Sequence, residues 1–448
     1  MRRLIKWPKK NWGESNMEVK IPYGKNEYVP VDIPEKNLIG VFDVEEKEKI
    51  EDTAGAVKKV LENPVKADSL KKLAEGRKNA VIAITDHSRP NIEKIALPII
   101  VEMLNEAGLE NDNITVMIGP GSHRPAYEEE VKDKLGSVYE KVNYVCHSAF
   151  DSEMVDLGET SFGHPVKINK QFYEADLKIA LGTVLPHPFA GFSGGGKMVS
   201  VGVASDETIS STHRPVIVDN PQASFGIVED NPFYLSSLEM AEMAEVDFLI
   251  NGVMNEEEEL FYVQAGKVEE AHRDIVAYVR DMFEVKVPEK ADVLVVASGY
   301  PKDSNLYHVS AMGVCAVAGS AVKYPCVDKG ARLIMVSPME DGIYNHVFYD
   351  TLAKYESPEE VVNVVGAFEE FEPGHHRAYG VAQVLSDHEV VMAQSYLEKD
   401  VFEKIHMSYA DTAQKAVDQA LADFGEDARI AVMQYSHRMI VKYDPEVK

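Results

Sequence analysis

Short apolar runs alternate along the chain with longer segments in which apolar residues recur every three or four positions. A short apolar run is typical of a buried strand, and the longer period is typical of a helix that packs on a sheet. The alternation predicts an α/β fold with two domains, each a mostly parallel sheet flanked by helices. The expected strands cover residues 80–84, 114–118, 177–181, 247–250, 293–296, 333–336 and 430–433.

The helices expected between these strands have one apolar face. In the segment 92–107, Ile92, Ile95 and Ile99 fall on the same side of a helix. Gly108 and Gly425 follow two of the helices, where a C-terminal cap is expected. The expected helices cover residues 43–61, 92–107, 268–283, 358–368 and 412–424.

A change in composition around residues 287–290 predicts the domain boundary. A proline and several charges stand there directly before a new strand. We expect a first domain at residues 18–287 and a second at 288–424, and the segment 425–448 is a candidate to return to the first domain. Met17 begins a run expected to be the first strand, and the basic residues before it are expected to be an extension or a misassigned start.

Composition narrows the class of protein. The 448 residues are 45% hydrophobic, which is enough for large cores and excludes a disordered chain. The net charge of −28 repels phosphate backbones and anionic lipids, so nucleic-acid and membrane-surface partners are excluded. Three widely spaced cysteines fit neither a disulfide framework nor a zinc ribbon, and no apolar run reaches the roughly 18 residues of a spanning helix. These features predict a cytoplasmic protein.

Four short segments join turn-forming Gly or Pro to titratable side chains, and three of them directly follow a predicted strand. In doubly wound sheets, ligands bind outside the carboxyl ends of the strands, so these segments predict a site, expected in the cleft between the two domains. The segments are TDHSRP (85–90), GPGSHRP (119–125), PHPFAGFSGGGK (186–197) and STHRP (211–215).

The glycine-rich segment has two interpretations. Gly191, Gly196 and Lys197 satisfy the GxxxxGK pattern of a phosphate-binding loop, but Met198 stands where that loop needs Ser or Thr to hold magnesium. The alternative is that the glycines allow close approach of a bulky, phosphate-bearing cofactor and that Lys197 is its covalent attachment point.

Three histidines are candidates for chemistry because each lies in a Gly/Pro-flanked loop beside a basic residue or the glycine run. They are His123, His187 and His213. His87 shares its loop with Asp86 and Arg89, which are equally good candidates. No spacing predicts a zinc site, although one histidine is enough for a metal held mainly by a cofactor. The histidines expected to be structural are His147, His164, His346, His375, His376 and His437.

In this order, the motifs DHSRP, GSHRP, HPFAGFSGGGK and THRP resemble the lactate racemase family, whose members use a nickel-pincer nucleotide. His187 precedes Lys197 by ten residues and His213 follows it by sixteen, as in the family. The resemblance extends to PKDSNLYH in the second domain. It therefore covers most of the chain.

The resemblance implies a role for each matching residue. Lys197 would attach the cofactor through a thioamide, His213 would bind its nickel, and His123 and His187 would be acid/base residues, one for each enantiomer of a 2-hydroxy acid. Arg89 would also hold the substrate carboxylate, and separate synthesis proteins would donate the cofactor transiently. The residues implied to contact the cofactor are Asp86, Ser88, Arg89, Gly194, Gly195 and Gly196.

The sequence departs from the family at one substrate-contacting motif. Lactate-specific members have Tyr-Gln-x-x-Lys where this chain has Tyr307, His308 and, at the last position, Ala311. Loss of that cation leaves room for a longer or less polar substrate, so we expect a 2-hydroxy acid other than lactate, unless Lys302 or Lys323 supplies the charge. The expected reaction is racemisation or epimerisation by reversible transfer of the C2 hydride.

Two other functions stay open at this point. The chain is alternatively a degenerate P-loop-like nucleotide-binding protein, or a catalytically inactive homologue that only binds ligand. Retention of His123, His187, Lys197 and His213 favours the racemase.

Overall fold

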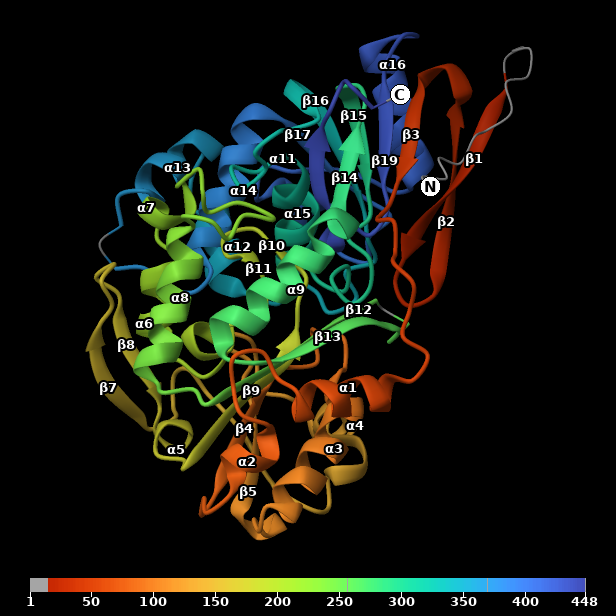
Figure 1. The fold of residues 1–448 in the computed structure, drawn as a ribbon. Coiled ribbons are helices and arrows are strands. Elements are labelled where there is room, and N and C mark those ends of the chain that lie inside the picture. Colours follow the sequence, from red (N-terminus) through yellow and green to blue (C-terminus); the bar gives the residue numbers. More distant parts are fainter. Residues whose placement is uncertain (1–14, 256, 369, 448) are drawn as a thin grey trace.

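The computed structural model describes residues 15–255, 257–368 and 370–447, and these form two α/β halves stacked on one another (Figure 1). The residues 1–14, where most of the basic leading segment falls, lie outside this description. The first half is built on a six-stranded sheet in the order β13-β12-β9-β4-β5-β6, parallel except for β13. Its strands are β4 (Ala80–Ile84), β5 (Ile114–Ile118), β6 (Asn143–Cys146), β9 (Leu177–Thr183), β12 (Phe248–Met254) and β13 (Leu260–Gly266).

Helices cover both faces of the first sheet because its central strands are apolar on both sides. Ile82 of β4 packs in a cluster with the helices on one face, and its neighbour Ala83 packs in a second cluster on the other. The first group is α1 (Thr53–Glu62), α2 (Leu70–Ala74), α3 (Glu93–Glu106) and α4 (Glu128–Leu135). The second side carries α5 (Lys170–Tyr173), α6 (Asp206–Thr212), α8 (Pro232–Met243), α9 (Val268–Phe283) and the π-helix Met198–Gly202.

The second half contains a fully parallel six-stranded sheet in the order β18-β17-β16-β15-β19-β3. Its strands are β15 (Ala291–Val296), β16 (Val327–Val336), β17 (Glu389–Ala393), β18 (Ser408–Ala410), β19 (Ile430–Met433) and β3 (Leu38–Phe42). Its helices are α10 (Leu306–Val309), the π-helix Ser310–Cys315, α11 (Ala316–Ala318), α12 (His346–Ala353), α13 (Pro358–Val365), α14 (His375–Asp387), α15 (Lys399–Glu403) and α16 (Ala413–Phe424).

Smaller elements complete the chain. The short helix α7 (Pro215–Val218) follows α6, and 3-10 turns lie at Glu35–Asn37, Asn111–Asn113, Gly136–Val138 and Ser436–Arg438. The four two-stranded pairings are β1 (Asn16–Tyr23) with β2 (Glu27–Pro34), β7 (Met154–Glu159) with β8 (Pro165–Asn169), β10 (Pro186–His187) with β11 (Gly191–Phe192), and β14 (Glu284–Val287) with β20 (Ile440–Tyr443).

Two strands from opposite ends of the described chain, β3 and β19, lie in the second sheet, which differs from the sequence prediction. β19, a candidate to return to the first domain, lies between β15 and β3 in the second sheet. The segment 18–42, predicted to belong to the first domain, also packs there: the β1–β2 hairpin places Ile21 and Val31 in one core with Val295 of β15. The buried, apolar β19 needs a neighbour on each side, and β3 supplies the second one.

The helix expected over 43–61 begins only at Thr53, where Asp52 caps it by accepting a hydrogen bond from the Gly55 amide at 2.9 Å. The residues before it run without regular structure from the second sheet to the first. Arg438 holds this segment, because its guanidinium pairs with Asp43 at 2.8 Å and Glu46 at 2.9 Å. The ion pairs of Arg438 with Asp43 and Glu46, which are far apart from it in the sequence, therefore outweigh the local helical pattern of this segment.

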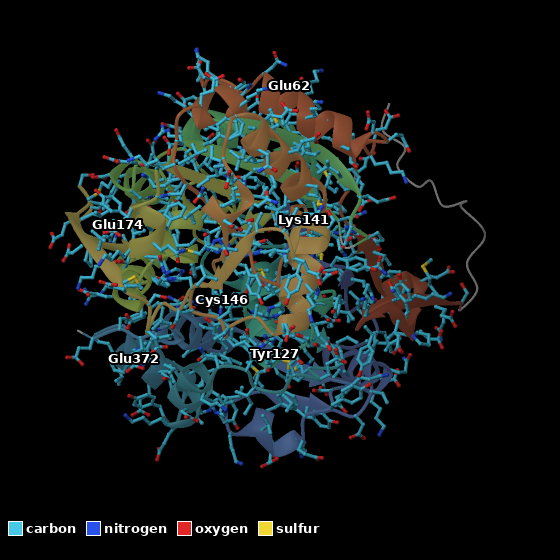
Figure 2. All side chains as sticks on the ribbon, turned by 90° about the horizontal axis from the view of Figure 1, so that it is seen from below. Glu62, Tyr127, Lys141, Cys146, Glu174 and Glu372 are labelled. Atoms are coloured by element: carbon cyan, nitrogen blue, oxygen red, sulfur yellow. The ribbon has the colours of Figure 1, made fainter. Side chains whose placement is uncertain are left out.

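Charged side chains cover the outside of the molecule, as Figure 2 shows around Glu62, Lys141 and Glu174. Within the part of the chain that the structure describes, no helix combines the length and the apolar character that crossing a membrane requires.

Asn37 provides a test of the strand arrangement at the N-terminus. Its buried amide donates hydrogen bonds to the carbonyl oxygens of Glu426 at 2.8 Å and Ala428 at 2.7 Å, next to the start of β19. We expect Asn37→Ala to lower the free energy of unfolding by about 1–3 kcal/mol, because the buried Ala428 carbonyl and the partly buried Glu426 carbonyl lose their donor. Urea denaturation measures this, with Asn113→Ala at an exposed turn as control; equal stability of the two variants would contradict the arrangement.

Candidate active site

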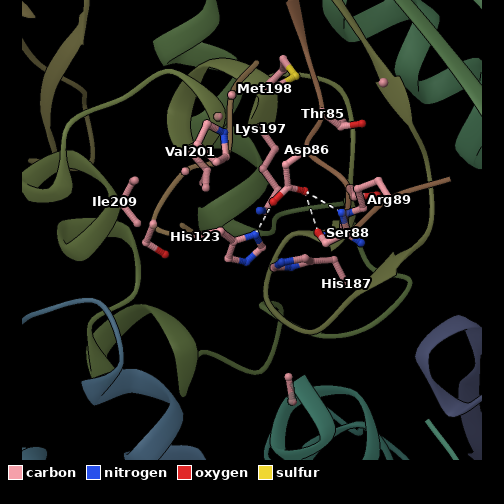
Figure 3. Close-up of a pocket in the computed structure, with 18 of the residues that line it drawn as sticks. Thr85, Asp86, Ser88, Arg89, His123, His187, Lys197, Met198, Val201 and Ile209 are labelled. Carbon is pink, nitrogen blue, oxygen red and sulfur yellow. Dashed lines mark hydrogen bonds and ion pairs between the residues drawn. The ribbon is translucent and has the colours of Figure 1, made fainter. Parts of the chain in front are cut away.

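A pocket of about 150 Å³ lies where loops of the two halves meet. The loops that follow β4, β5, β9 and β15 all contribute to it, so the site is at the carboxyl ends of parallel strands in both sheets. Figure 3 shows Asp86, His123, His187 and Lys197 pointing toward one another there. The predicted residues that line the pocket are Asp86, Ser88, Arg89, His123, His187, Gly194, Lys197, His213, Tyr307, His308 and Ala311.

Gly195 and Gly196 do not line the pocket, in contrast to their predicted contact with a cofactor. A Cβ atom on Gly195 would stand 2.9 Å from the His272 ring, and one on Gly196 would stand 2.3 Å from the Ser237 carbonyl oxygen. These glycines are therefore needed for close packing of the loop against α8 and α9. Only Gly194 of the three faces the cavity.

The backbone of this loop is also unlike a phosphate-binding loop. The Ser193 amide donates to the Leu185 carbonyl at 2.8 Å, the Gly195 amide to Asn251 Oδ1 at 2.8 Å, and the Lys197 amide to the Gly194 carbonyl at 3.2 Å. A phosphate loop must leave such amides free for the ligand. The GxxxxGK pattern is thus met in sequence, but three of its amides already donate hydrogen bonds within the protein.

Asp86 orients His123. One carboxylate oxygen of Asp86 lies 2.6 Å from His123 Nδ1, and the other accepts a hydrogen bond from Ser88 Oγ at 2.7 Å. Burial alone would raise the pKa of Asp86, but the contact with His123 outweighs it and holds that pKa well below its usual range. The ionised carboxylate accepts the Nδ1 proton, so Nε2 of a neutral His123 ring carries the lone pair.

His187 is held the opposite way round. The β10–β11 hairpin places its Nδ1 within 3.3 Å of the Phe189 amide and 3.2 Å of the Ala190 amide, both of which donate to it. Nε2 therefore carries the proton of the neutral ring. Burial, followed by the charges of Lys197 and Arg89, holds the pKa of His187 well below its usual range. His187 consequently stays neutral and offers an N–H group.

Lys197 is a buried amine at the start of the π-helix Met198–Gly202. Burial, together with the neighbouring Arg89 guanidinium, lowers the pKa of Lys197 to about 7, although Asp86 opposes this. A large fraction of the side chain is therefore an uncharged, nucleophilic amine near neutral pH. This is the state that covalent attachment of a cofactor requires.

His213 follows α6, and its ring is fixed by a hydrogen bond from Nδ1 to the Ile209 carbonyl at 2.7 Å. Nε2 therefore has the free lone pair, as a metal ligand needs. Burial lowers the pKa of His213 to about 3, so the ring stays neutral. Across the described residues, no three His, Cys, Asp or Glu side chains form a cluster able to hold a metal ion. A metal here would need its other ligands from a cofactor.

Several residues of the pocket were missed by the sequence analysis. His376, expected to be structural, lies with its ring centroid 4.7 Å from that of His213, and Arg377 lines the cavity beside it. Both follow the Pro-Gly turn at the start of α14, which is the signal that marked the other loops. Lys302 also lines the pocket, whereas Lys323 borders a separate cavity, so only Lys302 is placed to supply the charge missing at position 311.

Comparisons with known proteins match both halves of the chain. Residues 23–226 match the lactate racemase N-terminal domain and residues 286–441 the lactate racemase C-terminal domain. The chain is 31% identical to a lactate racemase of Thermoanaerobacterium thermosaccharolyticum, over 95% of this chain and 99% of the relative. It is 32% identical to a lactate racemase of Lactiplantibacillus plantarum, over 86% and 90%.

Solved structures agree. The lactate racemase apoprotein from T. thermosaccharolyticum superposes with a TM-score of 0.86 at 29% identity, covering 95% of this chain and all of that one. A Thermotoga maritima protein, 19% identical with a TM-score of 0.67 over 88% of this chain and 98% of that one, shares the fold. The two-domain fold and its pocket are thus those of an isomerase of the racemase or epimerase class. The chain belongs to the lactate racemase family.

The buried amine of Lys197 makes stability depend on pH. The unfolded chain holds this proton up to the ordinary lysine pKa, whereas the folded protein loses it near pH 7, so stability rises with pH between the two values. We expect Lys197→Met to stabilise the cofactor-free protein, and its advantage should be about 2 kcal/mol greater at about pH 7 than at about pH 9. Denaturant unfolding at both pH values tests this; a pH-independent difference would contradict the buried amine.

Proposed function

We propose that the protein racemises or epimerises a 2-hydroxy acid other than lactate, using a nickel-pincer nucleotide attached to Lys197. The observation that carries the proposal is the convergence of His123, His187, Lys197 and His213 on one pocket. The names of the two relatives support a 2-hydroxy acid as the substrate class. The departure at Ala311 supports a substrate other than lactate.

Hydride transfer explains why such a racemase needs both a cofactor and acid/base histidines. The C2 proton of a 2-hydroxy acid is too weakly acidic for an imidazole to remove. When bound, the cofactor supplies a hydride acceptor for C2, and the planar 2-oxo acid that results is able to receive the hydride on either face. The protein then needs only to move the hydroxyl proton, which is within the range of imidazole acid/base chemistry.

The two histidines are arranged to contact the substrate oxygen in different ways. His123 presents a lone pair at Nε2 and is suited to take the hydroxyl proton, with Asp86 stabilising the imidazolium that forms. His187 presents an N–H group, which is suited to donate a hydrogen bond to the substrate oxygen. Arg89, which is half-buried, lines the same pocket and is suited to hold the carboxylate of the substrate.

The donor set of the pocket fits the proposed cofactor. Lys197 has an amine that is partly uncharged near neutral pH, and His213 offers one neutral imidazole nitrogen. His213 would hold the nickel through this nitrogen, and the cofactor would supply the other donors. Since no cluster of His, Cys, Asp or Glu among the described residues is able to hold a metal ion by itself, loading would depend on separate synthesis proteins as transient donors.

Cofactor attachment is tested by the intact mass and nickel content of protein co-expressed with the cofactor-synthesis proteins. We expect a mass adduct and bound nickel in the wild type and in the control Lys323→Ala, and neither in Lys197→Ala. An unmodified wild type, under conditions that load a known family member, would contradict the proposal. Magnesium-dependent binding of ATP or GTP would then favour the P-loop-like alternative.

The path of the C2 hydrogen tests the reaction itself. A 2-hydroxy acid labelled with deuterium at C2 should retain the label after racemisation in ordinary water, because the hydrogen moves as a hydride and does not exchange. Chiral chromatography with mass spectrometry measures both outcomes. Washout of deuterium would indicate proton abstraction, and binding without any stereochemical change would indicate an inactive homologue. A clear preference for lactate among the acids would contradict the substrate assignment.

A further inference from the structure

Lys302 is a buried lysine that has no role in the reaction described above. Its side chain is only 4% exposed, and it lies in the loop after β15. Among the described residues, its ammonium group has no hydrogen-bond or ion-pair partner. Burying an ammonium group without a partner is costly, so such a residue usually marks a binding site.

The loop around Lys302 is rigid. The Lys302 amide donates to the Gly299 carbonyl at 2.8 Å. The next residue, Asp303, accepts a hydrogen bond from the Gly24 amide at 2.7 Å through its carboxylate and one from Ser337 Oγ at 2.7 Å through its carbonyl. The β1–β2 hairpin and the end of β16 thus hold the position of Lys302, and the buried ammonium is not the result of a loose loop.

His308 provides a second unpartnered donor in the same wall. Asn305 Oδ1 accepts the His308 amide proton at 2.9 Å, so Asn305 Nδ2 faces the ring and donates to His308 Nδ1 at 3.1 Å. The proton of the neutral His308 ring is therefore on Nε2, and this buried nitrogen has no hydrogen-bond partner. The ring centroid of His308 lies 5.3 Å from that of the proposed acid/base His123.

No carboxylate pairs directly with these two donors. Asp86 is the one carboxylate among the described residues that line the pocket; its charge favours the charged forms of Lys302 and His308, but His123 and Ser88 already occupy its two oxygens. Lys302 and His308 line both the pocket and a larger cleft of about 760 Å³ that adjoins it. Both residues therefore border the cleft as well as the pocket that contains Lys197.

We propose that Lys302 and His308 form a carboxylate-binding subsite in the second-domain wall, which holds a carboxylate of the substrate; this inference rests on the proposed function. An anion that accepts from Lys302 Nζ and His308 Nε2 satisfies both orphaned donors at once. The bound carboxylate is either the C1 carboxylate, shared with Arg89, or a second carboxylate on a longer 2-hydroxy acid. The small side chain of Ala311, in the same wall, leaves room for either.

The charge state of Lys302 is consistent with a site that awaits an anion. In the pocket without ligand, burial and then the Arg89 charge hold the pKa of Lys302 well below its usual range. A carboxylate at the subsite supplies the missing opposite charge and favours the ammonium form. Ligand binding and protonation of Lys302 are therefore coupled.

The test compares nickel-loaded wild type, Lys302→Met, Lys302→Arg and the double variant Lys302→Met/Ala311→Lys. Lys323→Met is the matched control, since it removes a lysine from a different cavity. The acids are lactate, 2-hydroxybutyrate and malate, with racemisation followed by chiral chromatography. We expect Lys302→Met to raise KM about ten- to hundredfold with a smaller change in kcat, while retaining nickel and melting no lower than the wild type.

The outcomes separate the possibilities. A rise in KM for all three acids assigns the C1 carboxylate to the subsite, and a rise for malate alone assigns a second carboxylate. Partial rescue by Lys302→Arg, or by the double variant, supports a charge contact and excludes a structural role. An unchanged KM in Lys302→Met, as in Lys323→Met, overturns the subsite.

The activity of the loaded wild type distinguishes failure of the proposed function from failure of the subsite. If the loaded wild type racemises none of these acids, titration calorimetry with lactate and malate still tests the subsite. Weaker binding to Lys302→Met than to wild type supports it. Equal binding, or no binding to the wild type, overturns it.

Discussion

The feature on which the site depends is the burial of positive charge around a single carboxylate. Arg89, Lys197, Lys302 and Arg377 line one pocket in which Asp86 is the one carboxylate among the described lining residues. Burial disfavours every charged form, and the cations also repel one another. Their pKa values are therefore lowered: Lys197 is partly an uncharged amine near neutral pH, and the buried His187 and His213 are neutral. The same imbalance makes the pocket receptive to anionic ligands.

The topology of the two sheets brings these charged residues together at one pocket. Parallel strands of both sheets end at the pocket, so the loops that follow these strands bring their side chains directly into it. The segment between β3 and α1 crosses from one half to the other, and Arg438 fastens it through Asp43 and Glu46. One core cluster, which includes Phe283 of the first half and Leu294 of the second, continues across the junction. The pocket is therefore bounded by halves that pack directly against one another.

The sequence predicted those parts of the fold whose causes are local. The buried strands Ala80–Ile84, Ile114–Ile118 and Ile430–Met433 have the expected bounds because all their residues except Thr115 are apolar. The partner of β19 was not predictable, since pairing with β3 joins segments far apart in the sequence. In the site, Gly- and Pro-flanked loops identified Lys197 and its neighbours. Lys302 was named only as one of two lysines able to supply the charge missing at position 311, because its setting depends on how the two halves pack together.

The group that faces Nδ1 decides what each histidine can do. A carboxylate at His123 and a backbone carbonyl at His213 accept the Nδ1 proton, which leaves a lone pair at Nε2. Backbone amides at His187 and the Asn305 amide group at His308 donate to Nδ1, which leaves an N–H at Nε2. Rings of one residue type thereby present two acceptors and two donors at Nε2. Proton exchange with solvent does not erase this division, because changing a tautomer would cost a buried hydrogen bond.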